Sequence, residues 1–140
     1  VAYRNRKGPI ETTEELVSVI RNILPSPLQR KMNRHPARRV FQALRIAVND
    51  EIGALREGLE QAGKATKATG CVAVVSYHSL EDRRVKRAFR ELAARGGFLL
   101  PVRKAVAPSD DEMRENPRSR SAKLRVLERE ARAAGLDQGV

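Results

Sequence analysis

The sequence is poor in the residues that build disulfide frameworks, zinc clusters and aromatic cores. It has 140 residues, one cysteine, two histidines and no tryptophan, and Phe, Trp and Tyr together make up 4%. A single cysteine excludes a disulfide within the chain and leaves no ligand set for a zinc cluster. Cys71 lies in an apolar run, where we expect a small buried side chain. Any core must be aliphatic, and this cysteine usage is typical of a reducing, cytoplasmic compartment.

Long apolar runs and the common catalytic motifs are also missing. No stretch reaches the roughly 18 to 20 apolar residues that a membrane-spanning helix needs. The first ten residues, VAYRNRKGPI, do not form the apolar region of a signal peptide. We therefore expect no membrane partner. The sequence has no Gly-x-Ser-x-Gly elbow, Walker loop or Gly-x-Gly-x-x-Gly turn, so its motifs show no complete catalytic machinery.

Positive charge is what the sequence has in excess. Lys and Arg total 28 against 17 Asp and Glu, which gives a formal net charge of +11. Such a surplus favours a polyanionic partner, and nucleic acid is the first candidate. A chain of this length corresponds to one domain, and if compact it could bury roughly 68% of its unfolded surface. Its 41% hydrophobic content is typical of a globular protein.

Two amphipathic helices are predicted in the first half of the chain. Thr12 and Glu15 have the spacing of a capping box, and apolar residues then recur at helical intervals, which predicts a helix over 13–24. A longer helix is expected from Ala37 to Gly63, with Gly63 as its terminator. Its apolar residues are spaced three or four apart on one face, which should be core. They are Phe41, Leu44, Val48, Ile52, Leu55 and Leu59.

The second half of the chain alternates strand and helix signals. Residues 72–76, VAVVS, are small or β-branched without polar alternation, which is typical of a strand covered on both faces, as in parallel sheets. Ser79 and Asp82 have capping-box spacing and predict a helix over about 80–95. FLLPV and KLRVLE are weaker strand candidates, the second near a sheet edge, and Ser109 is another helix start. This order of elements predicts an α/β fold.

The predicted strand 72–76 needs hydrogen-bonding neighbours on both sides, because unpaired backbone groups are costly when buried. The chain supplies only the two weaker strand candidates. One edge of the sheet should therefore be bare. We expect the isolated chain to pair this edge with another molecule, self-association included, to fold loosely, or to be the ordered remnant of a longer protein.

The candidate chemistry lies at the end of the predicted strand, where open α/β sheets bind their ligands. Ser76, Tyr77, His78 and Ser79 occupy that end. One interpretation places them around a substrate or cofactor, with an anion at the free amides of the next helix. The other gives Ser79 only a capping role, which we favour, and lets His78 satisfy a neighbouring backbone group. For His78 both interpretations stay open.

Two clusters of cations are candidates for phosphate contact. Between residues 83 and 104, eight cations face a single acid, and between residues 1 and 49 Lys and Arg outnumber acids ten to three. Cations at a helix N-terminus have a small energetic cost. Those at the start of the predicted long helix therefore point to a function rather than to a solvated surface. They are Arg34, Arg38 and Arg39.

Three stretches together resemble a known family: HPARRVFQALRIAVNDEI at 35–52, VAVVSYHSLEDRRVKRAFRE at 72–91 and NPRSRSAKLRV at 116–126. In this order they are similar to the C-terminal portion of the bacterial S-adenosylmethionine-dependent methyltransferases that modify the exocyclic amine of a cytosine in 16S ribosomal RNA. RNRKGPIETTEELVSVI also resembles the family, so the resemblance covers most of 5–130. The chain departs from the family at ATGC, where a Pro-Gly-Gly turn is usual, and at Tyr77, where Phe is common.

The resemblance implies the C-terminal half of a Rossmann-like methyltransferase sheet, plus helices from an insertion that recognises the substrate. It assigns 1–34 to the end of that insertion, 35–130 to the Rossmann-like domain and 131–140 to a tail. The family's glycine-rich cofactor turn belongs to an N-terminal half with no counterpart in these residues. The resemblance therefore implies S-adenosylmethionine as the cofactor but places no cofactor-binding residue in this chain. We expect the isolated chain to be inactive.

The function expected from the resemblance is methylation of a cytosine amine in 16S ribosomal RNA or the small ribosomal subunit. This chain would supply RNA contacts and part of the pocket wall. Ser76 and His78 are the candidate catalytic residues, from their position at the strand end. The candidate RNA-binding residues are Arg34, Arg38, Arg39, Arg83, Arg84, Arg118 and Arg120. Two alternatives are a non-catalytic basic RNA-binding module and an interaction domain for an acidic protein.

Overall fold

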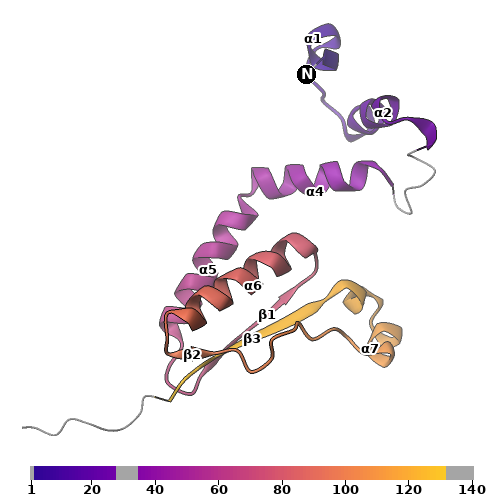
Figure 1. The fold of residues 1–140 in the computed structure, drawn as a ribbon. Helices are drawn as coiled ribbons and strands as arrows, with labels where there is room; N and C mark the ends of the chain where they lie inside the picture. The colour runs from indigo at the N-terminus through magenta and orange to yellow at the C-terminus, as the bar shows by residue number, and fades with distance from the viewer. Residues whose placement is uncertain (1, 28–34, 132–140) are drawn as a thin grey trace, which may run out of the picture. The chain divides into compact units, whose positions relative to one another are not determined.

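The computed structural model describes residues 2–27 and 35–131. The chain divides into two compact units, Val1–Glu51 and Ile52–Val140, which we call the N-terminal and C-terminal units. Helices and a three-stranded sheet make up the described residues, so the predicted α/β fold class is confirmed (Figure 1). Within those residues no helix has the length and apolar character to cross a membrane.

The N-terminal unit is helical. It contains α1 (Ala2–Lys7), α2 (Thr13–Ile23) and α4 (Ala37–Val48), and α2 packs against α4. The predicted capping box at the start of α2 is confirmed. The Thr12 hydroxyl accepts the backbone N–H of Glu15 at 3.1 Å, and the Glu15 carboxylate accepts the N–H of Thr12 at 3.3 Å. These reciprocal bonds satisfy amide donors that would otherwise be free at the helix start.

The single long helix predicted over 37–63 is wrong, because two helices occupy this stretch. α4 ends at Val48, and α5 (Glu51–Ala65) begins after a turn at Asn49 and Asp50. The backbone of Asp50 has φ 45°, a left-handed conformation that aspartate tolerates better than most residues. The apolar face of α4 is not core as predicted, since the Val48 side chain is 82% exposed.

Gly63 lies inside α5 and does not terminate it, contrary to prediction. It is buried, and a side-chain Cβ at this position would lie 3.3 Å from Leu92 Cδ1. Its lack of a side chain therefore allows close approach between α5 and Leu92, which belongs to α6 (Ser79–Ala94).

The C-terminal unit contains a three-stranded sheet in the order β1 (Cys71–Ser76), β3 (Lys123–Arg129), β2 (Phe98–Leu99). Both pairings are antiparallel, so the described residues do not contain the parallel neighbours that the composition of 72–76 predicted. The KLRVLE candidate forms β3, which is the central strand and not an edge strand. α7 (Asp110–Glu115) and the 3-10 helix η1 (Pro117–Ser121) precede β3, and Ser109 caps α7 as predicted.

One face of the sheet is covered by helices and carries the core of this unit. α6 follows β1 and lies along the sheet, and α5 adds Leu59 to the same core (Figure 1). Alternation along β1 turns Val72 and Val74 toward this face. The fully enclosed apolar cluster consists of Leu59, Val85, Phe89 and Leu127. It is aliphatic apart from one phenylalanine.

The opposite face of the sheet is open, and the prediction that β1 is covered on both faces is wrong. Val75, Leu99 and Val106 are about half exposed there. Cys71 is exposed as well, so its predicted burial is also wrong. Within the described residues β1 pairs only with β3, so its other edge has no strand partner there.

An ion pair ties α6 to the central strand on the covered face. The Asp82 carboxylate lies 2.7 Å from Arg125 Nε and 3.3 Å from Lys123 Nζ. The Asp82 and Arg125 side chains are only 12% and 13% exposed. The hydrogen bond from Arg125 is the main cause that lowers the pKa of Asp82 below its ordinary value, and it outweighs the opposing effect of desolvation. This carboxylate thus fixes the start of α6 on β3.

Candidate functional site

The turn between β1 and α6 contains the candidate catalytic residues. Ser76 ends β1, is 5% exposed, and its hydroxyl lies 3.5 Å from the carbonyl oxygen of Lys123. Tyr77 follows with a side chain that is 57% exposed. His78 comes next and immediately precedes α6. The strand end therefore carries one buried hydroxyl, one exposed ring and one half-buried imidazole.

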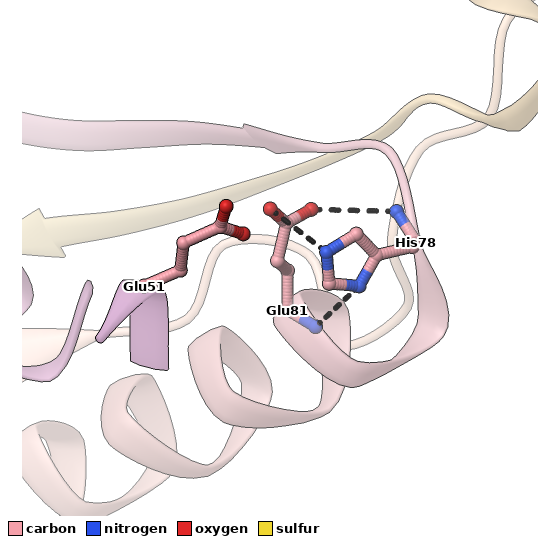
Figure 2. Close-up of side chains that lie close together, drawn as sticks. All are labelled: Glu51, His78 and Glu81. Carbon is pink, nitrogen blue, oxygen red and sulfur yellow. Dashed lines mark hydrogen bonds and ion pairs between the residues drawn. The ribbon is translucent and has the colours of Figure 1, made fainter. Parts of the chain in front are cut away.

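The His78 ring caps α6 together with Glu81 (Figure 2). His78 Nδ1 accepts the backbone N–H of Glu81 at 3.3 Å, and His78 Nε2 lies 3.1 Å from Glu81 Oε1. The same carboxylate accepts the N–H groups of Tyr77 and His78 at 3.1 and 3.4 Å. Both ring nitrogens thus face groups of Glu81. Of the two interpretations of His78, the structure contains the one in which the ring satisfies a neighbouring backbone group.

The predicted capping box of Ser79 and Asp82 is wrong by one residue. The box is formed by His78 and Glu81, because Asp82 faces the sheet and binds Arg125. The longer Glu81 side chain can reach back to the amides that precede α6. The N–H groups of Tyr77, His78 and Glu81 are therefore already bonded and are not available to an anion.

We expect His78→Ala to lower the free energy of unfolding by about 1 kcal/mol, because it removes the helix cap. His78→Asn should retain most of that stability, since asparagine is a preferred N-cap residue. Urea denaturation of both variants measures the difference. Equal losses in the two variants would contradict a capping role.

The antiparallel register brings η1 to the same end of the sheet as this turn. Ser76 pairs with Lys123, so the start of β3 lies beside the end of β1. η1 ends two residues before Lys123 and carries Arg118 and Arg120, both exposed. Two of the predicted RNA-binding cations are thus placed near the candidate catalytic residues.

The other predicted RNA-binding cations are distributed over both units. Arg38 and Arg39 are exposed in the first turn of α4, in the N-terminal unit. Arg83 and Arg84 are exposed in the second turn of α6, in the C-terminal unit. Arg34 lies outside the described residues.

Two further cations of the 83–104 cluster, Lys86 and Arg90, lie next to Arg83 but are not among the predicted RNA-binding residues. Lys86 and Arg90 line a shallow groove of about 390 Å³ with Arg83 along one flank of α6, whereas Arg84 does not line it. The signal was present in the sequence as cations spaced i, i+3 and i+7, which fall on one side of a helix. The number of cations over 83–104 does not by itself show which face of the helix carries them.

Comparison with known proteins identifies the relatives of the chain. The profile of the MraW methylase family matches residues 1–130. A protein named ribosomal RNA small subunit methyltransferase H from Chlorobium phaeobacteroides (strain BS1) is 43% identical over 143 residues, which cover 91% of this chain and 42% of that relative.

Two further relatives have the same name and come from Leptospira borgpetersenii serovar Hardjo-bovis, strains JB197 and L550. Each is 45% identical over 127 residues, which cover 91% of this chain and 40% of the relative. The chain therefore spans about two fifths of the length of these curated relatives. Because the family profile matches nearly the whole sequence, the chain belongs to the MraW methylase family.

Proposed function

We propose that this chain is part of an S-adenosylmethionine-dependent enzyme that methylates the exocyclic amine of a cytosine in 16S ribosomal RNA. The membership of residues 1–130 in the MraW methylase family carries this proposal. The names of the relatives support ribosomal RNA of the small subunit as the substrate. The chain's part in the reaction is RNA contact and one wall of the site.

The charge of the chain supports a role in RNA contact, with the cofactor bound elsewhere in the enzyme. The formal net charge of +11 favours a phosphate-rich partner. Exposed arginines in η1 lie at the sheet end that carries Ser76 and His78. The sequence has no Gly-x-Gly-x-x-Gly turn, and the amides before α6 are engaged by Glu81. The cofactor, which supplies the methyl group, is therefore assigned to the part of the enzyme that this chain does not span.

Methyl transfer depends mainly on alignment of the nucleophile with the methyl group and on the electrostatic environment. Ser76 and His78 suit such a positioning role, since one is buried and the other is held by Glu81. We propose that they border the reacting base and keep the β1–α6 turn in a fixed shape.

Calorimetric titration tests whether this chain binds RNA and leaves cofactor binding to the rest of the enzyme. We expect heat of binding with a small-subunit RNA fragment and none with S-adenosylmethionine, and we expect no methyl transfer by the chain alone. Saturable cofactor binding would contradict the assignment of the cofactor to the rest of the enzyme. If the chain binds RNA but supports no methyl transfer when it is joined to the rest of a relative, the result would instead favour a non-catalytic RNA-binding module.

A chimera tests the activity itself. The matching segment of the Chlorobium relative is replaced by this chain, and transfer of labelled methyl groups to unmodified small subunits is measured. Nuclease digestion and mass spectrometry then identify the methylated atom, and a position other than the cytosine amine would contradict the proposed specificity. His78→Asn in the chimera keeps the cap, so a fall in kcat at unchanged stability would place the ring in contact with the reacting base.

A further inference from the structure

One flank of α6 presents a row of cations along a shallow groove. Arg83, Lys86, Arg87 and Arg90 line the groove together with Glu91 and Ala94. Their spacing of three, four and seven residues places these cations on the same side of the helix. We call Arg83, Lys86 and Arg90 the cation row.

The cation row has no acidic partners among the described residues. Arg87 is different, because its Nε lies 2.7 Å from Glu91 Oε1. Asp82 is four residues before Lys86, but it is bound to Arg125 and Lys123 on the covered face of the sheet. Like charges three and four residues apart on a helix repel one another. A bound polyanion would remove this repulsion.

The positive surface continues beyond α6. Lys86 and Arg90 also line a small cleft between α6 and the segment after β2, where Leu100, Val102 and Arg103 lie. Arg103 is exposed, so it adds a fourth cation next to the cation row. The one aromatic residue of this cleft, Phe89, is 1% exposed and cannot stack on a base.

We propose that the cation row, together with Arg103, binds successive phosphates of an RNA strand without selecting its base sequence. This inference rests on the proposed function, in which the partner is RNA. Seven residues of α-helix separate Arg83 from Arg90, or about 10 Å along the axis. Three cations spread over that length can each contact a phosphate of one strand. The described residues that line the groove and the cleft include no exposed aromatic ring, so such contacts position the RNA and do not read its bases.

The test compares two variants that lose the same charge. The row variant is Arg83→Gln/Lys86→Gln/Arg90→Gln. The control variant is Arg56→Gln/Lys64→Gln/Arg114→Gln, because these cations already interact with acids. Lys64 is 3.0 Å from Glu60, Arg114 is bonded to Asp111, and the charge of Arg56 helps to lower the pKa of Glu60. Fluorescence anisotropy measures binding of two single-stranded RNAs of unrelated sequence over a series of salt concentrations.

We expect the row variant to bind both RNAs at least about tenfold more weakly at low salt. The slope of log affinity against log salt should become shallower by about 2, because three phosphate contacts at about 0.7 each are lost. The control variant should change affinity by less than about twofold. A charge-retaining variant, Arg83→Lys/Arg90→Lys, should keep the wild-type slope. Circular dichroism confirms that each variant keeps its helix content.

Other outcomes would overturn the inference in distinguishable ways. Equal losses in the row and control variants would mean that only net charge matters. Steep wild-type binding with an unchanged row variant would reject this surface and leave the proposed function standing. Wild-type binding to poly-glutamate but not to RNA would reject both this inference and the RNA contacts of the proposed function, in favour of an acidic protein partner.

Discussion

Replacing Asp82 with asparagine is expected to lower the free energy of unfolding of the C-terminal unit by about 3 kcal/mol. The substitution keeps the size of the side chain but removes the charge that faces Arg125 at 2.7 Å. The Arg125 side chain is only 13% exposed, so its guanidinium would remain largely out of water without a counter-charge. Breaking one half of a buried ion pair is costly for this reason, even where the intact pair contributes little.

A double variant separates the cost of the orphaned charge from the loss of packing. Asp82→Leu/Arg125→Met replaces both partners with apolar side chains, and it should be much closer to wild type than Asp82→Asn. Urea denaturation of the wild type, Asp82→Leu, Arg125→Met and the double variant completes the cycle. Additive losses would contradict a direct coupling between Asp82 and Arg125.

The pH dependence of the free energy of unfolding gives an independent test of the Asp82–Arg125 ion pair. The hydrogen bond from Arg125 holds the pKa of Asp82 below its ordinary value in the folded chain. A depressed carboxyl pKa contributes stability that is present above its unfolded pKa, about 3.9, and is lost as the pH falls through the folded pKa. The difference in stability between wild type and Asp82→Asn should therefore narrow below about pH 4. A constant difference down to pH 2 would contradict this assignment.

The local signals of the sequence predicted most of the secondary structure. Capping pairs and apolar periodicity placed α2 and α6, and the β-branched run placed β1. The break between α4 and α5 was not predictable from periodicity, because Val48 and Ile52 keep the helical spacing across it. The break depends on the left-handed backbone of Asp50, and aspartate is compatible with both helix and turn.

Features that depend on distant partners could not be read from local patterns. Glycine is common at helix ends, but Gly63 lies inside α5. A side chain there would crowd Leu92, which is 29 residues later in the sequence. Asp82 has the spacing of a capping residue but pairs with Arg125, which follows it by 43 residues. The burial of 72–76 was overestimated because an apolar strand does not show whether both of its faces are covered.

The candidate site also combines features that local signals predict with features that depend on distant partners. The strand end with Ser76 and His78 was predicted from the order of elements, and the structure places η1 beside it through the register of β1 with β3. That register pairs residues 47 apart, Ser76 with Lys123, and no local motif indicates it. The cation row, in contrast, follows from helical spacing alone and needed only the correct helix face.

Replacing Phe89 with alanine is expected to lower the free energy of unfolding by about 3 to 5 kcal/mol, because it removes the largest enclosed side chain of the core. Phe89 is 1% exposed and packs with Val85, Leu127 and Leu59, which come from α6, β3 and α5. Phe89 is one of only four residues in the buried apolar cluster of this unit, and the apolar residues around them are only partly buried. Such a loss can exceed the total stability of a small domain.

Phe89→Leu keeps the prediction measurable where the alanine variant does not fold. It leaves a smaller cavity and should lose less than half as much stability. Val48→Ala is the matched control, because a side chain that is 82% exposed should change stability by no more than about 0.5 kcal/mol. A loss below about 1 kcal/mol for Phe89→Ala would mean that this cluster does not hold the unit together.

Phe89 lies in α6, the helix that carries Lys86 and Arg90. Because Phe89→Leu removes no charge, a folded chain with this substitution should keep the wild-type salt dependence of RNA binding.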